Sequence, residues 1–424
     1  MLLALTVLSS LPLVFWSPDI SLAAAERKSD LSTASPESVG VSSERLRRLD
    51  AGMKGLVDEG KLAGIVTLLA RHGKVVHFSA AGKQDIRQPA LVRKDSIFRI
   101  YSMTKPVTGV AMMMLHEEGK WRLDDPVSKY IPEFSSLKVR VGENADGTPK
   151  LEAARRSMTM RELMTHTAGL AYGLGNDPVD KMYRETRVLN SAATLQSMIE
   201  GLAKLPLLAQ PGARWYYSIA VDVQGYLVEK FSGQQFDEFL QTRIFQPLGM
   251  KDTAFYLPKE KLLRLALVHG EDATGKLTPP SDNRGDPTVK PLGPSGGGGL
   301  FSTAEDYLRF AQMLLDGGQL NGVRLLAPRT VEMMRTNHVQ PEALKTMRPG
   351  NGWGMDFSVV MDAAAAGEPF SNGAYYWWGA AGTWFWIDPV EDFTFIGMIQ
   401  HQNTRTSTEI HGLSRNLVYQ AILN

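Results

Sequence analysis

The stretch IYSMTK, residues 100–105, is the most informative one in the chain, because it sets a serine and a lysine three positions apart. In a helix these positions share one face, so the Lys105 amine can reach the Ser102 hydroxyl. Serine is a weak nucleophile until a neighbouring base takes its proton, and burial can lower a lysine pKa enough for that role. Residues 107–118 follow as a helix that is apolar on all sides, which is typical of a buried position. The pattern predicts a serine nucleophile at Ser102, activated by Lys105.

The Ser-x-x-Lys pattern alone has little specificity, because two fixed positions in four recur by chance in a chain of 424 residues. Ser135 and Lys138 form a second match, beside a hairpin that we expect at residues 139–152 around Asp146-Gly147. The first match is favoured by its context, since a short apolar segment precedes Ser102 and a buried helix follows it.

Composition excludes several classes of protein. The chain has 46 Lys and Arg against 45 Asp and Glu, a net charge of +1, which favours no nucleic-acid partner. It has no cysteine, which excludes disulfides, thiolate catalysis and iron–sulfur clusters. The eight histidines show no metal-binding spacing, so no metal or cofactor is expected.

The first 25 residues are predicted to be a signal peptide. Residues 1–16 are almost entirely apolar, and three alanines at 23–25 precede the charged residues 26–28. Pro12 and Pro18 and the short apolar length argue against a stable membrane-spanning helix. Export to the periplasm or the exterior is the expectation, with a cytoplasmic location as the alternative if this segment is not a signal.

Four further segments follow in a set order: LMTHTAGL at 163–170, WYYS at 215–218, PLGM at 247–250 and GGLFST at 298–303. Together with IYSMTK they resemble the class C β-lactamases and their esterase relatives, within the penicillin-binding-protein superfamily of serine hydrolases. The resemblance runs from about residue 36 to the end. It implies an α/β (α+β) fold of the β-lactamase/transpeptidase type, with an antiparallel sheet flanked by helices and a mainly helical lobe.

The lobes can be assigned along the chain. Strands are expected near both ends and helices in the middle, so residues 36–110 and 290–424 are expected to share one sheet. Residues 111–289 would form the helical lobe, which carries the inserted hairpin. A capping box of Ser302 and Glu305 is expected to start a helix that ends near Leu315.

The superfamily's second motif, Tyr-x-Asn, matches Tyr217-Ser218-Ile219, with isoleucine in the asparagine position. A phenol beside a cationic lysine ionises more readily and can shuttle protons. The resemblance therefore implies that Tyr217 is catalytic. The alternative is that Tyr216 and Tyr217 are packing aromatics. Tyr101 and Ile219 are expected to contact the substrate.

The third motif, Lys-Thr-Gly, is absent, and Trp377-Trp378-Gly379 stands in its place. A Trp-x-Gly version resembles the family VIII carboxylesterases. By that resemblance the backbone amides of Ser102 and Ala380 would form the oxyanion hole, and Trp377 and Gly379 would contact the substrate. A tryptophan cannot pair with the carboxylate of a β-lactam or a peptide, which favours neutral esters.

Two other motifs compete with this assignment. Residues 293–297 read GPSGG, the Gly-x-Ser-x-Gly of α/β-hydrolases, and Asp388 and His401 or His411 follow in the matching order. Prolines before Ser295 and four glycines after it favour a glycine-rich loop instead. Ser281-Asp282-Asn283 matches a class A β-lactamase motif but lies in a polar turn. His166 is expected to be a structural hydrogen-bonding residue.

The sequence thus predicts a serine carboxylesterase that hydrolyses short-chain acyl esters by a Ser-Lys-Tyr acyl-enzyme mechanism. The expected partner is a small-molecule ester, with weak hydrolysis of β-lactams in addition. A class C-like β-lactamase or D-Ala-D-Ala peptidase is the first alternative, and a non-catalytic binding protein on the same fold is the second. The oligomeric state is left open.

Overall fold

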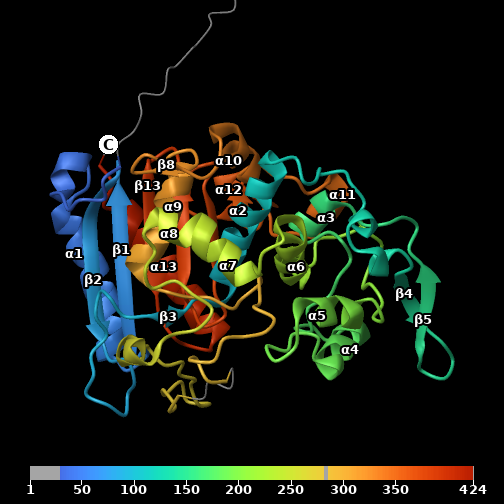
Figure 1. The fold of residues 1–424 in the computed structure, drawn as a ribbon. Coiled ribbons are helices and arrows are strands. Elements are labelled where there is room, and N and C mark those ends of the chain that lie inside the picture. The colour runs from blue at the N-terminus through green and yellow to red at the C-terminus, as the bar shows by residue number, and fades with distance from the viewer. Residues whose placement is uncertain (1–28, 281–284, 424) are drawn as a thin grey trace, which may run out of the picture.

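The computed structural model describes residues 29–280 and 285–423 (Figure 1). The expected signal peptide, residues 1–25, and the Ser281-Asp282-Asn283 motif lie outside the described residues. No helix in the described part of the chain is both long and apolar enough to cross a bilayer.

A seven-stranded antiparallel sheet joins the two ends of the chain, in the order β2-β1-β13-β12-β11-β10-β9. Strand β1 pairs with β13 in a register that places Val66 opposite Met398. Strands from the two ends of the chain thus lie in one sheet, and the predicted fold class is confirmed. The strands are β1 (Gly64–Arg71), β2 (Lys74–Gly82), β9 (Asn351–Trp353), β10 (Ser358–Val360), β11 (Tyr375–Trp378), β12 (Trp384–Asp388) and β13 (Phe393–Met398).

Both faces of this sheet are buried, because side chains alternate between two apolar layers. Ile65 and Leu69 pack with helices α1 (Ser43–Asp58) and α13 (Thr404–Tyr419) on one face. Val66 and Leu68 belong to the larger core on the other face, with α9 (Ala304–Leu315) and α2 (Thr104–Glu117). Every residue of α2 from Thr104 to Leu115 is buried, as the all-round apolar pattern predicted.

The helical region lies to one side of the sheet in Figure 1, with the hairpin β4–β5 at its far end. The hairpin strands are β4 (Lys138–Glu143) and β5 (Pro149–Ala153), close to the predicted 139–152. The helices are α3 (Met160–Met164), α4 (Pro178–Thr186), α5 (Leu195–Leu202), α6 (Ala220–Ser232), α7 (Phe236–Leu240) and α8 (Gln246–Leu248), with a π-helical turn at Gln241–Phe245.

The remaining elements are short. They are β3 (Phe98–Arg99), β6 (Phe301–Ser302), β7 (Gln319–Leu320), β8 (Val323–Arg324), α10 (Pro328–Met334), α11 (Pro341–Leu344), α12 (Ala363–Ala366) and 3₁₀ turns at Pro36–Val39, Tyr101–Met103, Val127–Lys129, Pro132–Phe134 and Lys259–Arg264.

The start of α9 differs from the prediction by one residue. Thr303 caps the helix by accepting a hydrogen bond from the Asp306 backbone N–H at 3.1 Å, so the Ser302–Glu305 capping box is wrong. Ser302 is unavailable for capping because it is paired in β6, with its hydroxyl 2.8 Å from that of Thr253.

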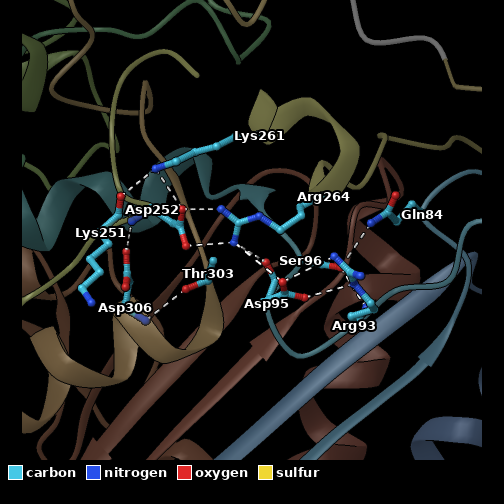
Figure 2. A network of polar contacts seen from close by, with 10 residues as sticks. All are labelled: Gln84, Arg93, Asp95, Ser96, Lys251, Asp252, Lys261, Arg264, Thr303 and Asp306. Atoms are coloured by element: carbon cyan, nitrogen blue, oxygen red, sulfur yellow. Dashed lines mark hydrogen bonds and ion pairs between the residues drawn. The ribbon is translucent and has the colours of Figure 1, made fainter. Parts of the chain in front are cut away.

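A polar network holds the segment that leads to β3 (Figure 2). The Arg264 guanidinium donates to both carboxylate oxygens of Asp252, at 2.9 and 2.5 Å, and also to the carbonyl of Asp95 at 3.0 Å. The backbone N–H of Asp252 donates to the Asp306 carboxyl at 2.7 Å. These contacts connect the first turn of α9 to residues 93–96. They also fix the chain just before the nucleophile motif.

The Asp306 carboxyl makes stability depend on pH. Burial raises its pKa to about 6, against an ordinary value near 3.9. The folded protein therefore keeps a proton that the unfolded chain releases as the pH rises from about 4 to about 6. Stability from this group is full below pH 4 and lost through pH 6, by about 3 kcal/mol. Relative to wild type, Asp306→Asn is expected to gain stability by that amount between pH 4 and 7, measured by urea unfolding.

The matched control is Glu305→Gln, an exposed carboxyl in the same helical turn. Its stability should follow that of the wild type across the same range. Parallel curves for Asp306→Asn and wild type would show that Asp306 does not titrate in this window.

Candidate active site

Ser102 lies at the junction between β3 and α2. Strand β3 pairs with β6, and the chain then turns sharply at Tyr101, whose φ of 44° is unusual for a residue other than glycine. Ser102 follows in a single 3₁₀ turn that leads directly into α2. The serine is half-buried, so its hydroxyl sits at the helix N-terminus with an exposed side.

Lys105 lies one turn further on and is fully buried. Its Nζ donates hydrogen bonds to Ser102 Oγ at 3.3 Å, to the Tyr172 hydroxyl at 3.3 Å and to the Gly297 carbonyl at 2.6 Å. The same atom is 4.6 Å from the centre of the Tyr217 ring. The three-residue spacing therefore brings serine and lysine together, and two phenols flank them.

The charge on Lys105 follows from these neighbours. Burial is the largest influence and lowers the pKa of the amine, but the electrostatic interactions with Tyr172, Tyr217 and Asp222 together outweigh it, and the pKa is raised. Lys105 is thus an ammonium at neutral pH. The argument from burial would instead free the amine to act as the base. The direction differs because two phenols and the Asp222 carboxyl, which are distant from Lys105 in the sequence, lie near it in the fold.

The backbone on both sides of Tyr217 is hydrogen-bonded to His166. The His166 carbonyl accepts from the Tyr216 N–H at 2.9 Å, and His166 Nδ1 accepts from the Ser218 N–H at 3.1 Å. The His166 ring lies 4.9 Å from the Tyr217 ring. Burial and then the Lys105 charge hold the pKa of His166 well below its usual range, so the ring is neutral. The structural role expected for His166 agrees with these contacts.

The Tyr217 hydroxyl also accepts a hydrogen bond from Trp377 Nε1 at 3.3 Å. Trp377 ends the buried face of β11 and packs edge-on against Trp353, with ring centres 4.5 Å apart. It is only 6% exposed. Most of this indole is therefore enclosed, and its N–H points to the phenol.

The segment after β11 lies directly beside the segment before Ser102. A Cβ on Gly379 would be 2.3 Å from the Ile100 carbonyl oxygen, so only glycine permits this approach. Thr383 Oγ1 donates to the same carbonyl at 3.2 Å. Ala380 follows Gly379 and is exposed. The backbone next to Ala380 therefore lies against the backbone that precedes Ser102.

Two of the residues expected to contact the substrate are buried. Ile219 is completely buried and starts α6, with its N–H bonded to the Ala171 carbonyl at 3.0 Å. Its side chain has no exposed surface, because an apolar residue in the asparagine position packs into the core. Tyr101 is also buried and packs with Val268 and Ala381.

Sequence reasoning missed Tyr172, Asp222 and Gly297. Tyr172 follows the 163–170 motif by two residues, and Asp222 follows Tyr217 by five, but neither spacing shows that the side chains meet at Lys105. Burial raises the pKa of the Tyr172 phenol despite the opposing charge of Lys105, so Tyr172 is protonated at neutral pH.

The α/β-hydrolase alternative is not supported by the structure. The Ser295 hydroxyl donates to Asp222 at 2.5 Å and not to a histidine. Asp388 accepts from the Tyr419 hydroxyl at 2.6 Å. His401 contacts Glu271, and His411 contacts the Gly382 carbonyl.

The second Ser-x-x-Lys match differs from the first in its surroundings. Ser135 and Lys138 are both exposed, and Lys138 begins β4.

An antiparallel sheet packed between helices, with a half-buried serine bonded to a buried lysine one turn later, defines a serine hydrolase of the β-lactamase/transpeptidase fold. The family model described as Beta-lactamase matches residues 49–419. The chain therefore belongs to the β-lactamase family.

Proteins similar to this chain indicate which class of enzyme it is within that family. Esterase EstB of Burkholderia gladioli is 31% identical over 355 residues, which cover 80% of this chain and 86% of that protein. An uncharacterized protein of Mycobacterium tuberculosis is 37% identical over 365 residues, which cover 83% of this chain and 89% of that protein. The solved structure of EstCE1, described as a hydrolase with promiscuous acyltransferase activity, is 28% identical with a TM-score of 0.75, and covers 91% of this chain and 99% of that chain. The protein fits the family VIII esterases of the class C β-lactamase and penicillin-binding-protein superfamily, and is a carboxylic ester hydrolase.

Proposed function

We propose that the protein hydrolyses short-chain acyl esters through an acyl-enzyme at Ser102, with Lys105 and Tyr217 as the other catalytic residues. The observation that carries this proposal is the 3.3 Å contact between Lys105 Nζ and Ser102 Oγ, with the Tyr217 ring over the same nitrogen. A nucleophile, a fixed positive charge and a phenol within one cluster are the groups that acyl transfer needs.

Because Lys105 is an ammonium, the base in this proposal is the phenolate form of Tyr217. The ammonium beside the ring and the Trp377 indole N–H both stabilise negative charge on that oxygen. Lys105 also donates to Ser102 Oγ, which orients the hydroxyl and stabilises charge on it as the proton leaves.

The cycle has two halves. Ser102 Oγ attacks the ester carbonyl carbon while its proton passes to Tyr217, and the oxyanion binds to the N–H groups of Ser102 and Ala380. The carbon–oxygen bond to the alcohol then breaks, and the alcohol leaves with the proton from Tyr217. Water next attacks the acyl-enzyme, gives its proton to Tyr217, and releases the acid as Ser102 regains a proton.

Neutral esters suit this site best. Trp377 occupies the place where the related β-lactamases and peptidases carry a lysine, so that cation for a substrate carboxylate is missing. EstB and the Lovastatin esterase of Penicillium rubens, which is 29% identical over 307 residues, are both named as esterases. Slow β-lactam hydrolysis is proposed as a side activity. A putative D-alanyl-D-alanine carboxypeptidase of Salmonella agona is 27% identical to this chain. The peptidase alternative is therefore included in the test.

The test combines labelling with a comparison of substrates. A fluorophosphonate should modify Ser102, identified by mass spectrometry, and p-nitrophenyl butyrate should be turned over far faster than nitrocefin or a D-Ala-D-Ala peptide. Faster turnover of nitrocefin or of the peptide would replace the esterase assignment by the first alternative. A label without turnover would support the binding-protein alternative.

The Trp377 indole N–H can be tested by itself. Trp377→Phe keeps an aromatic ring but removes the donor to Tyr217, and kcat for p-nitrophenyl butyrate is expected to fall about tenfold. Trp378→Phe is the matched control, because its ring packs 4.2 Å from that of Trp377 while the hydrogen bond to Tyr217 comes from Trp377. Equal losses in the two variants would mean that packing, and not the hydrogen bond, explains the effect.

A further inference from the structure

A glycine-rich loop, residues 295–300, joins α2 to α6 behind the active site. On the α2 side, Thr108 Oγ1 donates to the Gly296 carbonyl at 2.8 Å and Thr104 Oγ1 accepts from the Leu300 N–H at 3.1 Å. Between these contacts the Gly297 carbonyl accepts from Lys105 Nζ at 2.6 Å, the shortest hydrogen bond that this nitrogen makes. The loop therefore supplies a main ligand of the catalytic lysine.

On the α6 side the same loop is held by Asp222. This carboxyl is fully buried in the first turn of α6. Its Oδ1 accepts from Ser295 Oγ at 2.5 Å and from the Gly297 N–H at 3.0 Å. One residue, Gly297, thus gives its N–H to Asp222 and its carbonyl to Lys105. The position of the carbonyl is set by the carboxyl.

The approach is close enough to require glycine at this position. A Cβ on Gly297 would lie 2.4 Å from Asp222 Oδ2 and 3.0 Å from the Tyr172 hydroxyl. The carboxyl, the phenol and the loop backbone therefore converge at one point. The GPSGG segment therefore has a structural explanation, because its serine and glycines allow the loop to lie between Asp222 and Lys105.

We infer that Asp222 is a positioning residue of the reaction, which fixes the Gly297 carbonyl on Lys105 through Ser295 and the Gly297 N–H, and whose negative charge balances the Lys105 ammonium. The inference rests on the proposed role of Lys105 beside Ser102. Asp222 itself does not touch the reacting atoms.

The charge balance around Lys105 points to the same residue. Burial holds the pKa of Asp356 well above its usual range, and burial holds that of His166 well below, so the charged form of each is disfavoured. The charge of Asp222 acts on Lys105 and on Tyr172, and raises the pKa of each. The titratable groups that face Lys105 from the surrounding elements are Tyr172, Tyr217, Asp222, His166 and Asp356.

The test is the pH dependence of kcat/KM in Asp222→Asn. The amide oxygen can still accept from Ser295 and Gly297, but the negative charge is gone. The lysine–phenol cluster should then lose its proton more easily, and the acid limb of the profile should move to lower pH by about one unit. A merely structural role would lower the rate without moving this limb.

Ser295→Ala is the matched variant. It keeps the charge of Asp222 but removes one of its two hydrogen bonds to the loop, so kcat should fall roughly tenfold while the acid limb stays in place. An Asp222→Asn profile that overlays the wild type would overturn the electrostatic part. A wild-type kcat in Ser295→Ala would overturn the positioning part, and this arm remains decisive if Asp222→Asn fails to fold.

The two proposals fail in different ways. Fluorophosphonate labelling of Ser102 in both variants shows that the nucleophile assignment holds independently of Asp222. If Ser102 is not labelled in wild type, the proposed function is wrong. If Ser102 is labelled and the profiles of all three proteins coincide, only the role of Asp222 is wrong.

Discussion

Ser102→Ala is expected to lower ester hydrolysis by at least about 10⁴-fold, because the proposed cycle has no other atom that can form the acyl-enzyme. Alanine removes the hydroxyl and leaves the backbone N–H and Lys105 in place, so binding of the ester should change little. The measurement is kcat and KM for p-nitrophenyl butyrate, together with fluorophosphonate labelling. Loss of kcat, unchanged melting temperature and loss of the label are the expected results.

Two serines serve as controls for this variant. Ser135 starts the second Ser-x-x-Lys match and is exposed, so Ser135→Ala should behave as wild type. Ser295 belongs to the GPSGG segment, and Ser295→Ala should keep the label on Ser102 despite its lower rate. Full activity in Ser102→Ala, or complete loss only in Ser295→Ala, would reject the nucleophile assignment.

Lys105→Met is expected to lower kcat by about 10³-fold or more. Methionine is long and unbranched and fills most of the same buried space, but it has no positive charge. Ser102 Oγ then loses its donor, and the phenolate form of Tyr217 loses the cation beside its ring. The expected signature is slow fluorophosphonate labelling of Ser102 as well as slow turnover, measured as a second-order rate constant.

Lys138→Met is the control, since it makes the same substitution at the exposed lysine of the second match. It should leave both rates unchanged. Near-ultraviolet circular dichroism of Lys105→Met should match the wild type, which separates lost chemistry from lost structure. Normal labelling and turnover in a folded Lys105→Met protein would remove the lysine from the mechanism.

The sequence predicted the contact between Ser102 and Lys105 because the two residues are only three positions apart in the chain. The spacing of three residues and the apolar run after it are enough to define one helix face and its burial. The sheet was also predictable in outline, since strands at both ends of the chain with helices between them leave few arrangements. The turn between β1 and β2 is also local: His72 and Gly73 both have positive φ there.

The state of Lys105 could not be predicted in the same way. Its pKa depends on Tyr172 and Asp222, which come from separate segments and approach the amine only in the folded chain. The apolar pattern around Lys105 indicates only that the residue is buried. Burial lowers the pKa of the amine, whereas all the influences together raise it. The burial of Ile219 could not be predicted for a related reason, because its position in a motif does not indicate how exposed its side chain is.

The GPSGG segment around Ser295 matches a nucleophile motif, but in the structure it forms a loop held by Asp222. Glycines on both sides of a serine indicate close backbone approach, and that inference holds, because Gly297 lies against Asp222 and Lys105. What the pattern cannot supply is which groups approach. Here they are a carboxyl and an ammonium on two helices, where an α/β-hydrolase would have a histidine.

The pairing of β1 with β13 has a consequence for how the enzyme is made. Val66 and Met398 are neighbours in the sheet but are separated by about 330 residues of chain. At ordinary rates of translation the nascent β1–β2 hairpin waits roughly half a minute on the ribosome before its partner strand emerges. During that interval the edge of β1 that will pair with β13 is unpaired. Unpaired apolar edges of this kind bind chaperones and can aggregate. The segment that follows β11 and lies against the nucleophile turn is also made late, so Ser102 is synthesised early but cannot work until nearly the whole chain is present.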